Sequence, residues 1–337
     1  MRLHRALRSA VAIAAGLLPL TQAAAQATPQ ATPQPMPGAT ASGGLPPQPG
    51  AALRDVRIPS RDGTLITGWW LPAKSASENT ATEVAPIARP VVVLLHGCGG
   101  LYSSARERAG LLSYRHGGLA QRLSDQGLHV VLPDSLTARG ERSLCEQRIG
   151  QRKIDQRQRR DDVLGTLEWL TRQPWADVSR VALLGWSHGG SAVLSSTDLG
   201  HAAVREASVR PRAAVAFYPG CSDALRNGYR PSAPLLMLLG DKDDWTPPAP
   251  CIELGRAVGA TVQVYPDSYH GFDDPSGSVR YRPEVPNGAN PGQGVHAGRN
   301  PVTGPQAWDA AVARLREALG SDNAAGQTLR NTRSQTP

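Results

Sequence analysis

The 337-residue sequence lacks several features that define common classes of protein. After residue 25, no run is long and apolar enough to form a membrane helix, so we expect no membrane insertion of the mature chain. No segment repeats at a fixed period, which excludes solenoids and propellers. The chain has four cysteines, none in a Cys-x-x-Cys pair or in zinc-like spacing with histidine. We therefore expect neither a metal site nor an organic cofactor.

Both ends of the chain differ in composition from its middle. Residues 1–25 contain three arginines, an apolar stretch and the run Ala23-Ala24-Ala25, a pattern typical of a secretory signal peptide. A retained membrane anchor is the alternative, but the apolar part is short for one. Residues 26–50 and 321–337 are rich in small and polar residues and cannot bury enough surface to fold, which predicts a disordered linker and tail. A single domain over residues 51–320, exported to the periplasm or secreted, is the expected arrangement.

Basic residues are concentrated in "RIGQRKIDQRQRR", residues 148–160, of a chain with a formal net charge of +8. Two interpretations are open: a solvated helix face or a site for a polyanion. Ile149, Ile154 and Asp155 interrupt the cluster and a helical pattern follows it, which favours the solvated face. No set of aromatic residues accompanies it for stacking bases, so we expect no nucleic-acid partner.

Strand and helix patterns alternate through the middle of the chain. Residues 53–73 predict an antiparallel hairpin, and further strands are predicted by "PVVVLLHG", "LHVVLPDS", "RVALLG", "AAVAFYPG", "PLLMLLGD" and "TVQVYPDS". Helical patterns separate most of them, which implies parallel crossovers. The prediction is one α/β domain with a mostly parallel sheet of about eight strands flanked by helices, and we expect it to be a monomer.

The expected carboxyl ends of the strands carry a serine, an acid and a histidine. Gly185-Trp186-Ser187-His188-Gly189 joins a strand to a helix and has the Gly-x-Ser-x-Gly pattern of a nucleophile elbow. A serine hydroxyl needs a histidine to take its proton and an acid to orient that histidine. His270 and Asp243 follow Ser187 in that order, so these three residues form the predicted catalytic triad.

These segments together resemble the dienelactone hydrolase branch of the α/β-hydrolase superfamily. The matching stretches, spread over residues 53–319, are "LLHGCGG", "LPDS", "GWSHGG", "YPGC", "GDKDDWTP" and "YHGFD". The resemblance implies an α/β-hydrolase fold and hydrolysis by the triad. Ser187 stands where dienelactone hydrolases proper have cysteine, which favours a general hydrolase of small-molecule carboxylic esters. A peptidase or amidase on the same triad and a non-catalytic binding protein are the alternatives.

Three acids lie in the turn after the strand that ends at Gly240. The family spacing Gly-x-x-Asp-x-x-x-Pro matches Gly240, Asp243 and Pro247, and it identifies Asp243 as the partner of His270. The carboxylates of Asp241 and Asp244 are expected to be solvated.

Acyl transfer also needs donors for the oxyanion, and we expect them to be the backbone N–H groups of His188 and Cys98, with Gly99 as the alternative to Cys98. His96 is expected to brace the loop that carries Cys98. Four aromatic residues are candidates for an apolar substrate pocket, although core packing is an equal alternative for the tryptophans. The candidates are Tyr102, Trp186, Trp245 and Tyr269.

Two further expectations concern the edge that carries the triad. Disulfides are predicted for Cys98 with Cys145 and for Cys221 with Cys251, because each pair joins loops expected at that edge. Residues 273–303 are rich in Pro, Gly and Asn and show no periodicity, so we expect a long loop that covers the cleft.

Overall fold

A computed structural model of the protein describes residues 52–74 and 88–320, all of which belong to one compact unit. The predicted signal peptide at residues 1–25, the linker at 26–50 and the tail at 321–337 lie outside the described residues.

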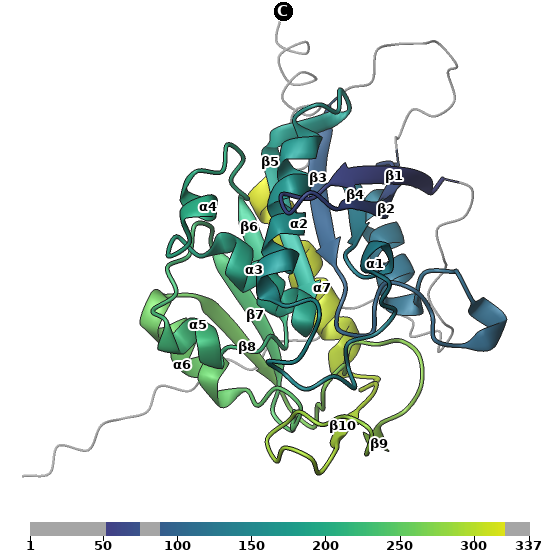
Figure 1. Cartoon of the computed structure of the whole chain (residues 1–337), viewed down its shortest axis with the longest axis vertical. Helices are drawn as coiled ribbons and strands as arrows, with labels where there is room; N and C mark the ends of the chain where they lie inside the picture. The colour runs from purple at the N-terminus through teal and green to yellow at the C-terminus, as the bar shows by residue number, and fades with distance from the viewer. Residues whose placement is uncertain (1–51, 75–87, 321–337) are drawn as a thin grey trace, which may run out of the picture. The chain divides into compact units, whose positions relative to one another are not determined.

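Eight strands form one sheet in the order β1-β2-β4-β3-β5-β6-β7-β8 (Figure 1). The strands β1, β2 and β4 pair antiparallel, and every pair from β4 to β8 is parallel. This confirms the predicted mostly parallel sheet and its antiparallel first hairpin. The bounds are β1 Arg54–Pro59, β2 Leu65–Leu71, β3 Arg89–Leu95, β4 His129–Asp134, β5 Ala176–Trp186, β6 Ala213–Phe217, β7 Leu235–Gly240 and β8 Thr261–Tyr265.

Helices cover both faces of this sheet. The apolar sides of α2, α3 and α6 share one core with the sheet, and those of α1 and α7 share the other. The helix bounds are α1 Tyr114–Asp125, α2 Gln156–Leu170, α3 His188–Thr197, α4 Ala202–Arg205, α5 Ser222–Arg226, α6 Ala249–Val258 and α7 Thr303–Leu319, with short 3₁₀ turns at Arg106–Arg108 and Thr137–Arg139. None of the helices in the described ranges is long and apolar enough to cross a membrane.

Strand β3 shows why the central strands are apolar throughout. Val91, Val93 and Leu95 pack into the core shared with α2, α3 and α6, whereas Val92 and Leu94 pack into the core on the other face. Successive side chains of a strand point to opposite faces, so a strand covered on both faces needs an unbroken apolar run. The crossovers place the carboxyl ends of β3, β5 and β7 at one edge of the sheet, where ligands bind in such folds.

Residues 273–303 are more ordered than the sequence predicts. Arg280–Arg282 (β9) and Val295–Ala297 (β10) pair antiparallel in a small second sheet. A bridge between His270 and Ala297 joins this hairpin to the loop after β8. Each strand is only three residues long, so neither shows the alternation that identifies a strand.

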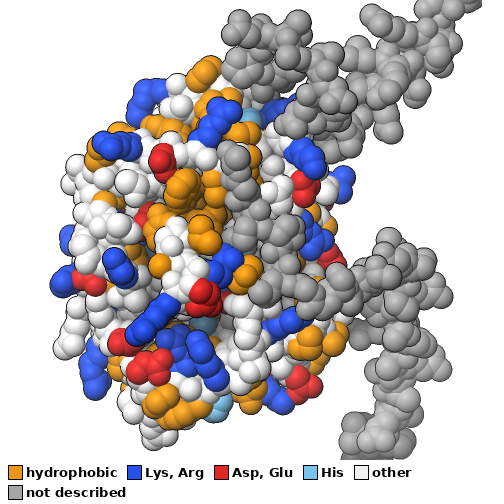
Figure 2. Space-filling view, turned by 90° about the vertical axis from the view of Figure 1, so that its right-hand side faces the viewer, with side chains coloured by type: hydrophobic (Ala, Val, Ile, Leu, Met, Phe, Trp, Pro, Cys, Tyr) orange, Lys and Arg blue, Asp and Glu red, His pale blue; other side chains and the backbone are white. Residues whose placement is uncertain are grey.

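The surface carries charges of both signs. On the face in Figure 2, Lys and Arg side chains lie among Asp and Glu side chains, with hydrophobic side chains between them. Many arginines are paired with acids, among them Arg61 with Glu168, Arg122 with Asp309 and Arg139 with Asp162. Such pairs limit how far any one sign of charge dominates this surface.

Candidate active site

Ser187 occupies a sharp turn between β5 and α3. Its φ of +53° and ψ of −116° lie in a region that residues other than glycine rarely adopt. The chain passes close to itself here: a Cβ on Gly185 would lie 2.3 Å from the carbonyl oxygen of Gly189, and a Cβ on Gly189 would lie 2.1 Å from that of Leu95. Only glycine fits at either position, which explains the Gly-x-Ser-x-Gly spacing.

Asp243 and His270 are in direct contact at the same edge. The Nδ1 atom of His270 lies 2.8 Å from Oδ2 of Asp243, and both side chains are buried. The other carboxylate oxygen of Asp243 accepts hydrogen bonds from the backbone N–H groups of Trp245 (2.9 Å) and Thr246 (2.8 Å). These bonds fix the direction in which the carboxylate faces His270.

Thr246 is a site residue that the sequence analysis missed. Its hydroxyl lies 3.0 Å from Oδ2 of Asp243 and 3.1 Å from Nδ1 of His270, and it also lies 3.0 Å from the carbonyl oxygen of Tyr218. The signal available in the sequence was its place between Asp243 and Pro247 in the family spacing.

Aromatic rings hold His270 from two directions. The ring centroids of Tyr218 and Trp245 lie 4.5 and 4.6 Å from that of the histidine. The tyrosine hydroxyl donates to the buried carboxylate of Asp273, which also accepts from the indole N–H of Trp186 at 2.8 Å. The imidazole plane is therefore fixed by packing as well as by hydrogen bonds.

The loop after β3 lies next to Ser187. A Cβ on Gly97 would lie 3.6 Å from the Cβ of Ser187, and Cys98 follows directly. His96 is fully buried and accepts the backbone N–H of Ser135 at Nε2 (3.2 Å), while its Nδ1 lies 2.8 Å from the carbonyl oxygen of Gly97. Burial, reinforced by Arg159, holds the pKa of His96 well below 6.5, which suits the bracing role predicted for it.

His188 begins α3, so its N–H points out of the first turn of the helix. Its imidazole is buried, and burial together with Arg159 and Arg152 holds its pKa well below 6.5. The side chain therefore remains neutral, and its backbone N–H is the group available at the site. The structure places this amide and that of Cys98 on the two segments that meet at Ser187.

Both predicted disulfides are present and therefore confirmed. Cys98 is bonded to Cys145, and Cys221 is bonded to Cys251. The first bond ties the loop beside Ser187 to the segment after β4, and the second ties the loop after β6 to α6. Both bonds thus stiffen the edge at which the site lies.

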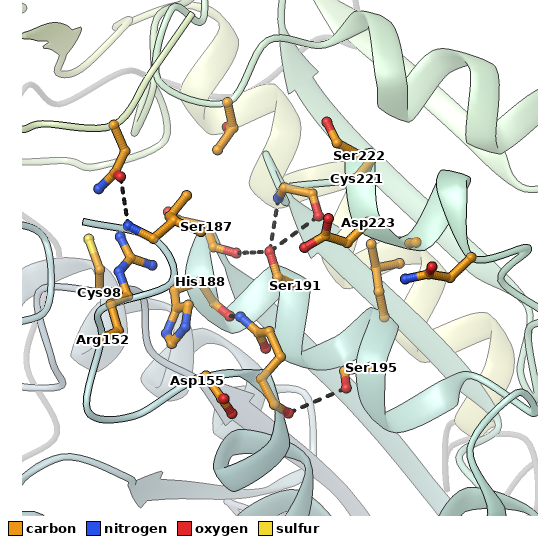
Figure 3. Close-up of a pocket in the computed structure, with 18 of the residues that line it drawn as sticks. Cys98, Arg152, Asp155, Ser187, His188, Ser191, Ser195, Cys221, Ser222 and Asp223 are labelled. Atoms are coloured by element: carbon orange, nitrogen blue, oxygen red, sulfur yellow. Dashed lines mark hydrogen bonds between the residues drawn. The ribbon is translucent and has the colours of Figure 1, made fainter. Parts of the chain in front are cut away.

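A cavity of about 730 Å³ opens beside Ser187. One face of α3 contributes Ser187, Ser191 and Ser195 to its wall, four residues apart along the helix, and Figure 3 shows how Ser191 lies between Ser187 and the loop at Cys221. Hydroxyl groups therefore line much of this side. Within the described part of the chain, no group of three or more His, Cys, Asp or Glu side chains is arranged to hold a metal ion.

Of the four predicted pocket aromatics, Trp245 alone lines this cavity. Trp186 is fully buried in the core shared with α1 and α7, so its predicted place on the pocket wall is wrong and core packing is correct. Tyr102 packs against the same core and accepts a hydrogen bond from Trp69, and Tyr269 lies beside His296. Trp186 is the last residue of β5, and its side chain enters the core on one face of the sheet although it directly precedes Ser187.

The basic segment at residues 148–160 is not simply a solvated face. Arg159 is 1% exposed and donates to the carbonyl oxygen of His96 at 2.9 Å. Arg152, Arg157 and Arg160 line the cavity beside Ser187. The expected solvated face is correct for Arg148 and Arg157, which are exposed, and wrong for Arg159, because α2 packs next to α3 and turns one side of the cluster toward the site.

Asp244 differs from the solvated residue that was expected. Its carboxylate accepts the backbone N–H of His296 at 2.8 Å and lies 2.7 Å from Nδ1 of the same histidine. It therefore ties the β9–β10 hairpin to the turn that carries Asp243. Asp241 is exposed, as expected, and accepts the N–H of Ser268 at 3.1 Å.

The segment between β9 and β10 also reaches the cavity, because Asn287 and Gly288 form part of its wall.

Comparisons with known proteins agree with this architecture. Residues 79–293 match the model of the dienelactone hydrolase family. A 142-residue part of the chain is 30% identical to dipeptidyl aminopeptidase BIII of Pseudoxanthomonas mexicana; it represents 42% of this chain and 19% of that protein, so the chain spans about a fifth of that relative.

Solved structures show the same fold at low identity. A Klebsiella pneumoniae protein named for the dienelactone hydrolases has a TM-score of 0.55 and 18% identity, over 78% of this chain and 98% of its own. A puromycin-hydrolyzing peptidase of Mycobacterium tuberculosis has a TM-score of 0.56 and 17% identity, over 81% of this chain and 40% of its own. The fold and the site define an α/β hydrolase. The chain belongs to the dienelactone hydrolase family.

Proposed function

We propose that this protein is an exported serine hydrolase that cleaves carboxylic esters, with Ser187 as nucleophile, His270 as general base and Asp243 as the orienting acid. The observation that carries the proposal is the 2.8 Å contact between His270 Nδ1 and Asp243, at the edge where Ser187 is held in a strained turn. An acid on Nδ1 leaves Nε2 with the lone pair that a general base needs.

Each step of the reaction is assigned to a group of this chain. The Ser187 hydroxyl attacks the ester carbonyl while its proton passes to Nε2 of His270, and the backbone N–H groups of His188 and Cys98 stabilise the oxyanion. The imidazolium then protonates the departing alkoxide, which leaves an acyl group on Ser187. Water, activated by the same imidazole, releases the acid and restores the serine.

A matched pair of acetyl derivatives tests the reaction and its preference. Purified protein should hydrolyse 4-nitrophenyl acetate much faster than 4-nitroacetanilide, and Ser187→Ala should lose both activities while keeping the wild-type Tm. Ser191→Ala is the matched control, because Ser191 lies one turn further along the same face of α3. Ester hydrolysis that persists in Ser187→Ala would contradict the proposal.

Amide hydrolysis is the second candidate, because the chain resembles a dipeptidyl aminopeptidase over 142 residues. The same triad cleaves amides. Faster hydrolysis of the anilide than of the ester, still dependent on Ser187, would favour the peptidase. A non-catalytic binding protein would hydrolyse neither compound.

Export is supported by the two disulfides, because such bonds persist in oxidising compartments. Residues 1–25 would direct it. Mass spectrometry of the protein recovered from the periplasm or medium should find an N-terminus just after Ala25. An uncleaved, cytosolic product with four free thiols would contradict this part of the proposal.

A further inference from the structure

Three arginines of the cavity wall form no close ion pair, although the charge of Arg160 acts on the nearby carboxylate of Asp161. Within the described residues, no carboxylate lies within ion-pair distance of Arg152, Arg157 or Arg160, although arginines elsewhere are commonly paired. Arg152 is half-buried, and burial alone accounts for the lowering of its pKa, since no acid opposes it. The Nε atom of Arg160 is buried without an acceptor. Arg152 and Arg160 are half-buried, Arg157 is exposed, and Arg152 donates to the carbonyl oxygen of Gln147 at 3.4 Å. Guanidinium groups without a close carboxylate partner are available to bind an anion.

The carboxylates of the same cavity are already engaged. Asp155 caps α2 by accepting the N–H of Arg157, and Asp198 accepts two backbone N–H groups. Asp223 is paired with Arg226 at 3.0 Å. These acids therefore do not satisfy the three guanidinium groups, although they reduce the net positive charge around them.

The arginines are spread along the cavity rather than gathered at one point. Figure 3 draws Arg152 on the side of the cavity that also holds Cys98 and Ser187, while Arg160 donates to the hydroxyl of Ser195 at 2.9 Å. Ser195 follows Ser187 by eight residues, which is roughly 12 Å along a helix axis. One carboxylate cannot contact both ends of such an array.

We infer that the cavity beside Ser187 binds a molecule with at least two negative charges, either carboxylates or phosphates, through Arg152, Arg157 and Arg160. This inference rests on the proposed function in one respect: the bound molecule would be the ester substrate or its hydrolysis product. The arginines would act on binding: they would hold the charged part of the molecule along α2 and the segment before it, while the ester lies at Ser187.

Calorimetry with three simple anions tests the inference without relying on catalysis. Citrate and tripolyphosphate should each bind more tightly than acetate, by about tenfold or more, because hydrogen bonds to charged groups are worth about that factor each. Arg152→Gln and Arg160→Gln should each weaken citrate or tripolyphosphate binding by about 10- to 100-fold. Added salt should weaken it further. Stronger binding of citrate assigns the charges to carboxylates, and stronger binding of tripolyphosphate assigns them to phosphates.

Arg172→Gln is the matched control, since Arg172 is an exposed arginine just beyond the other end of α2 and does not line the cavity. It should bind all three anions as the wild type does. Equal affinity for acetate and the multivalent anions, or unchanged binding in Arg152→Gln and Arg160→Gln, would overturn the inference.

Failure of the proposed function and failure of the anion site give different results. The Ser187→Ala protein should still bind the multivalent anions, and in the wild type they should inhibit hydrolysis of 4-nitrophenyl acetate. Binding that persists while Ser187→Ala remains an active esterase would contradict the proposed nucleophile and leave the anion site supported. Binding without any inhibition would place the anion outside this cavity and overturn the inference.

Discussion

The two carboxylate oxygens of Asp243 have different partners, and this difference sets the tautomer of His270. One of its oxygens accepts two backbone N–H groups, and the other faces His270 and the hydroxyl of Thr246. An amide at this position would keep its oxygen toward the two backbone donors and turn its NH₂ toward the histidine. Nδ1 would then have to accept a hydrogen bond, so the proton would move to Nε2, which could no longer take the serine proton.

We therefore predict that Asp243→Asn lowers kcat for ester hydrolysis by about 10⁴-fold, the loss seen for the same change in a comparable triad. Asp241→Asn should lower it by less than about tenfold, because that carboxylate is exposed and contacts only a backbone amide. Steady-state kinetics of the two variants decides the matter. A collapse in Asp241→Asn with Asp243→Asn still active would reverse the assignment.

Between the elements, the buried Asp273 joins four segments of the chain. Its carboxylate accepts hydrogen bonds from Trp186 at the end of β5, from Tyr218 after β6 and from Trp308 in α7. Arg115 in α1 lies 3.4 Å away and is also paired with Asp274. This network supports the loop that carries His270, because Tyr218 packs on the imidazole.

Asp273→Asn should lower the free energy of unfolding by about 3 kcal/mol. The change removes a buried negative charge opposite Arg115, and it places an NH₂ group against side chains that also donate hydrogen bonds. Asp274→Asn is the matched comparison, and it should cost about 1 kcal/mol because its carboxylate is 27% exposed. Urea denaturation with intact disulfides measures both. Equal losses in the two variants would show that the network is not the source of the stability.

The sequence predicts well those helices and strands in which the apolar residues recur with one constant spacing. The eight strands and the helices after them follow from unbroken or alternating apolar runs. The placement of Ser187, Asp243 and His270 at one edge follows because β5, β7 and β8 are parallel and end there. The β9–β10 hairpin was missed because three-residue strands show no period. The cavity wall was missed because it depends on which side of α2 packs against α3, and the arginine-rich segment carries no apolar stripe that indicates this side.

Across the described part of the molecule, four of the buried histidines link stability to pH. Burial lowers the pKa of His116 to about 3 and that of His129 to about 4, and burial holds the pKa of His96 and His188 well below 6.5. In the unfolded chain these residues would titrate near about 6.5. Below that pH the histidines bind protons in the unfolded state but remain neutral in the folded state.

The protein should therefore lose stability as the pH falls below about 6.5, and it should change little through these histidines above that value. Each histidine should contribute a loss of up to about 2 kcal/mol at pH 5. Urea denaturation between pH 5 and pH 8 provides the measurement. A free energy of unfolding that stays constant or rises as the pH falls from about 7 to about 5 would contradict the burial of neutral histidines.

The central claim is that Ser187 is the nucleophile, and covalent labelling tests it most directly. An organophosphonate that mimics the tetrahedral intermediate should add one phosphonyl group to the wild-type protein, and peptide mapping should locate it on Ser187. The Ser187→Ala protein should remain unlabelled, and Asp243→Asn should react much more slowly because the serine is less activated. Label on another serine, or undiminished labelling of Ser187→Ala, would contradict the account.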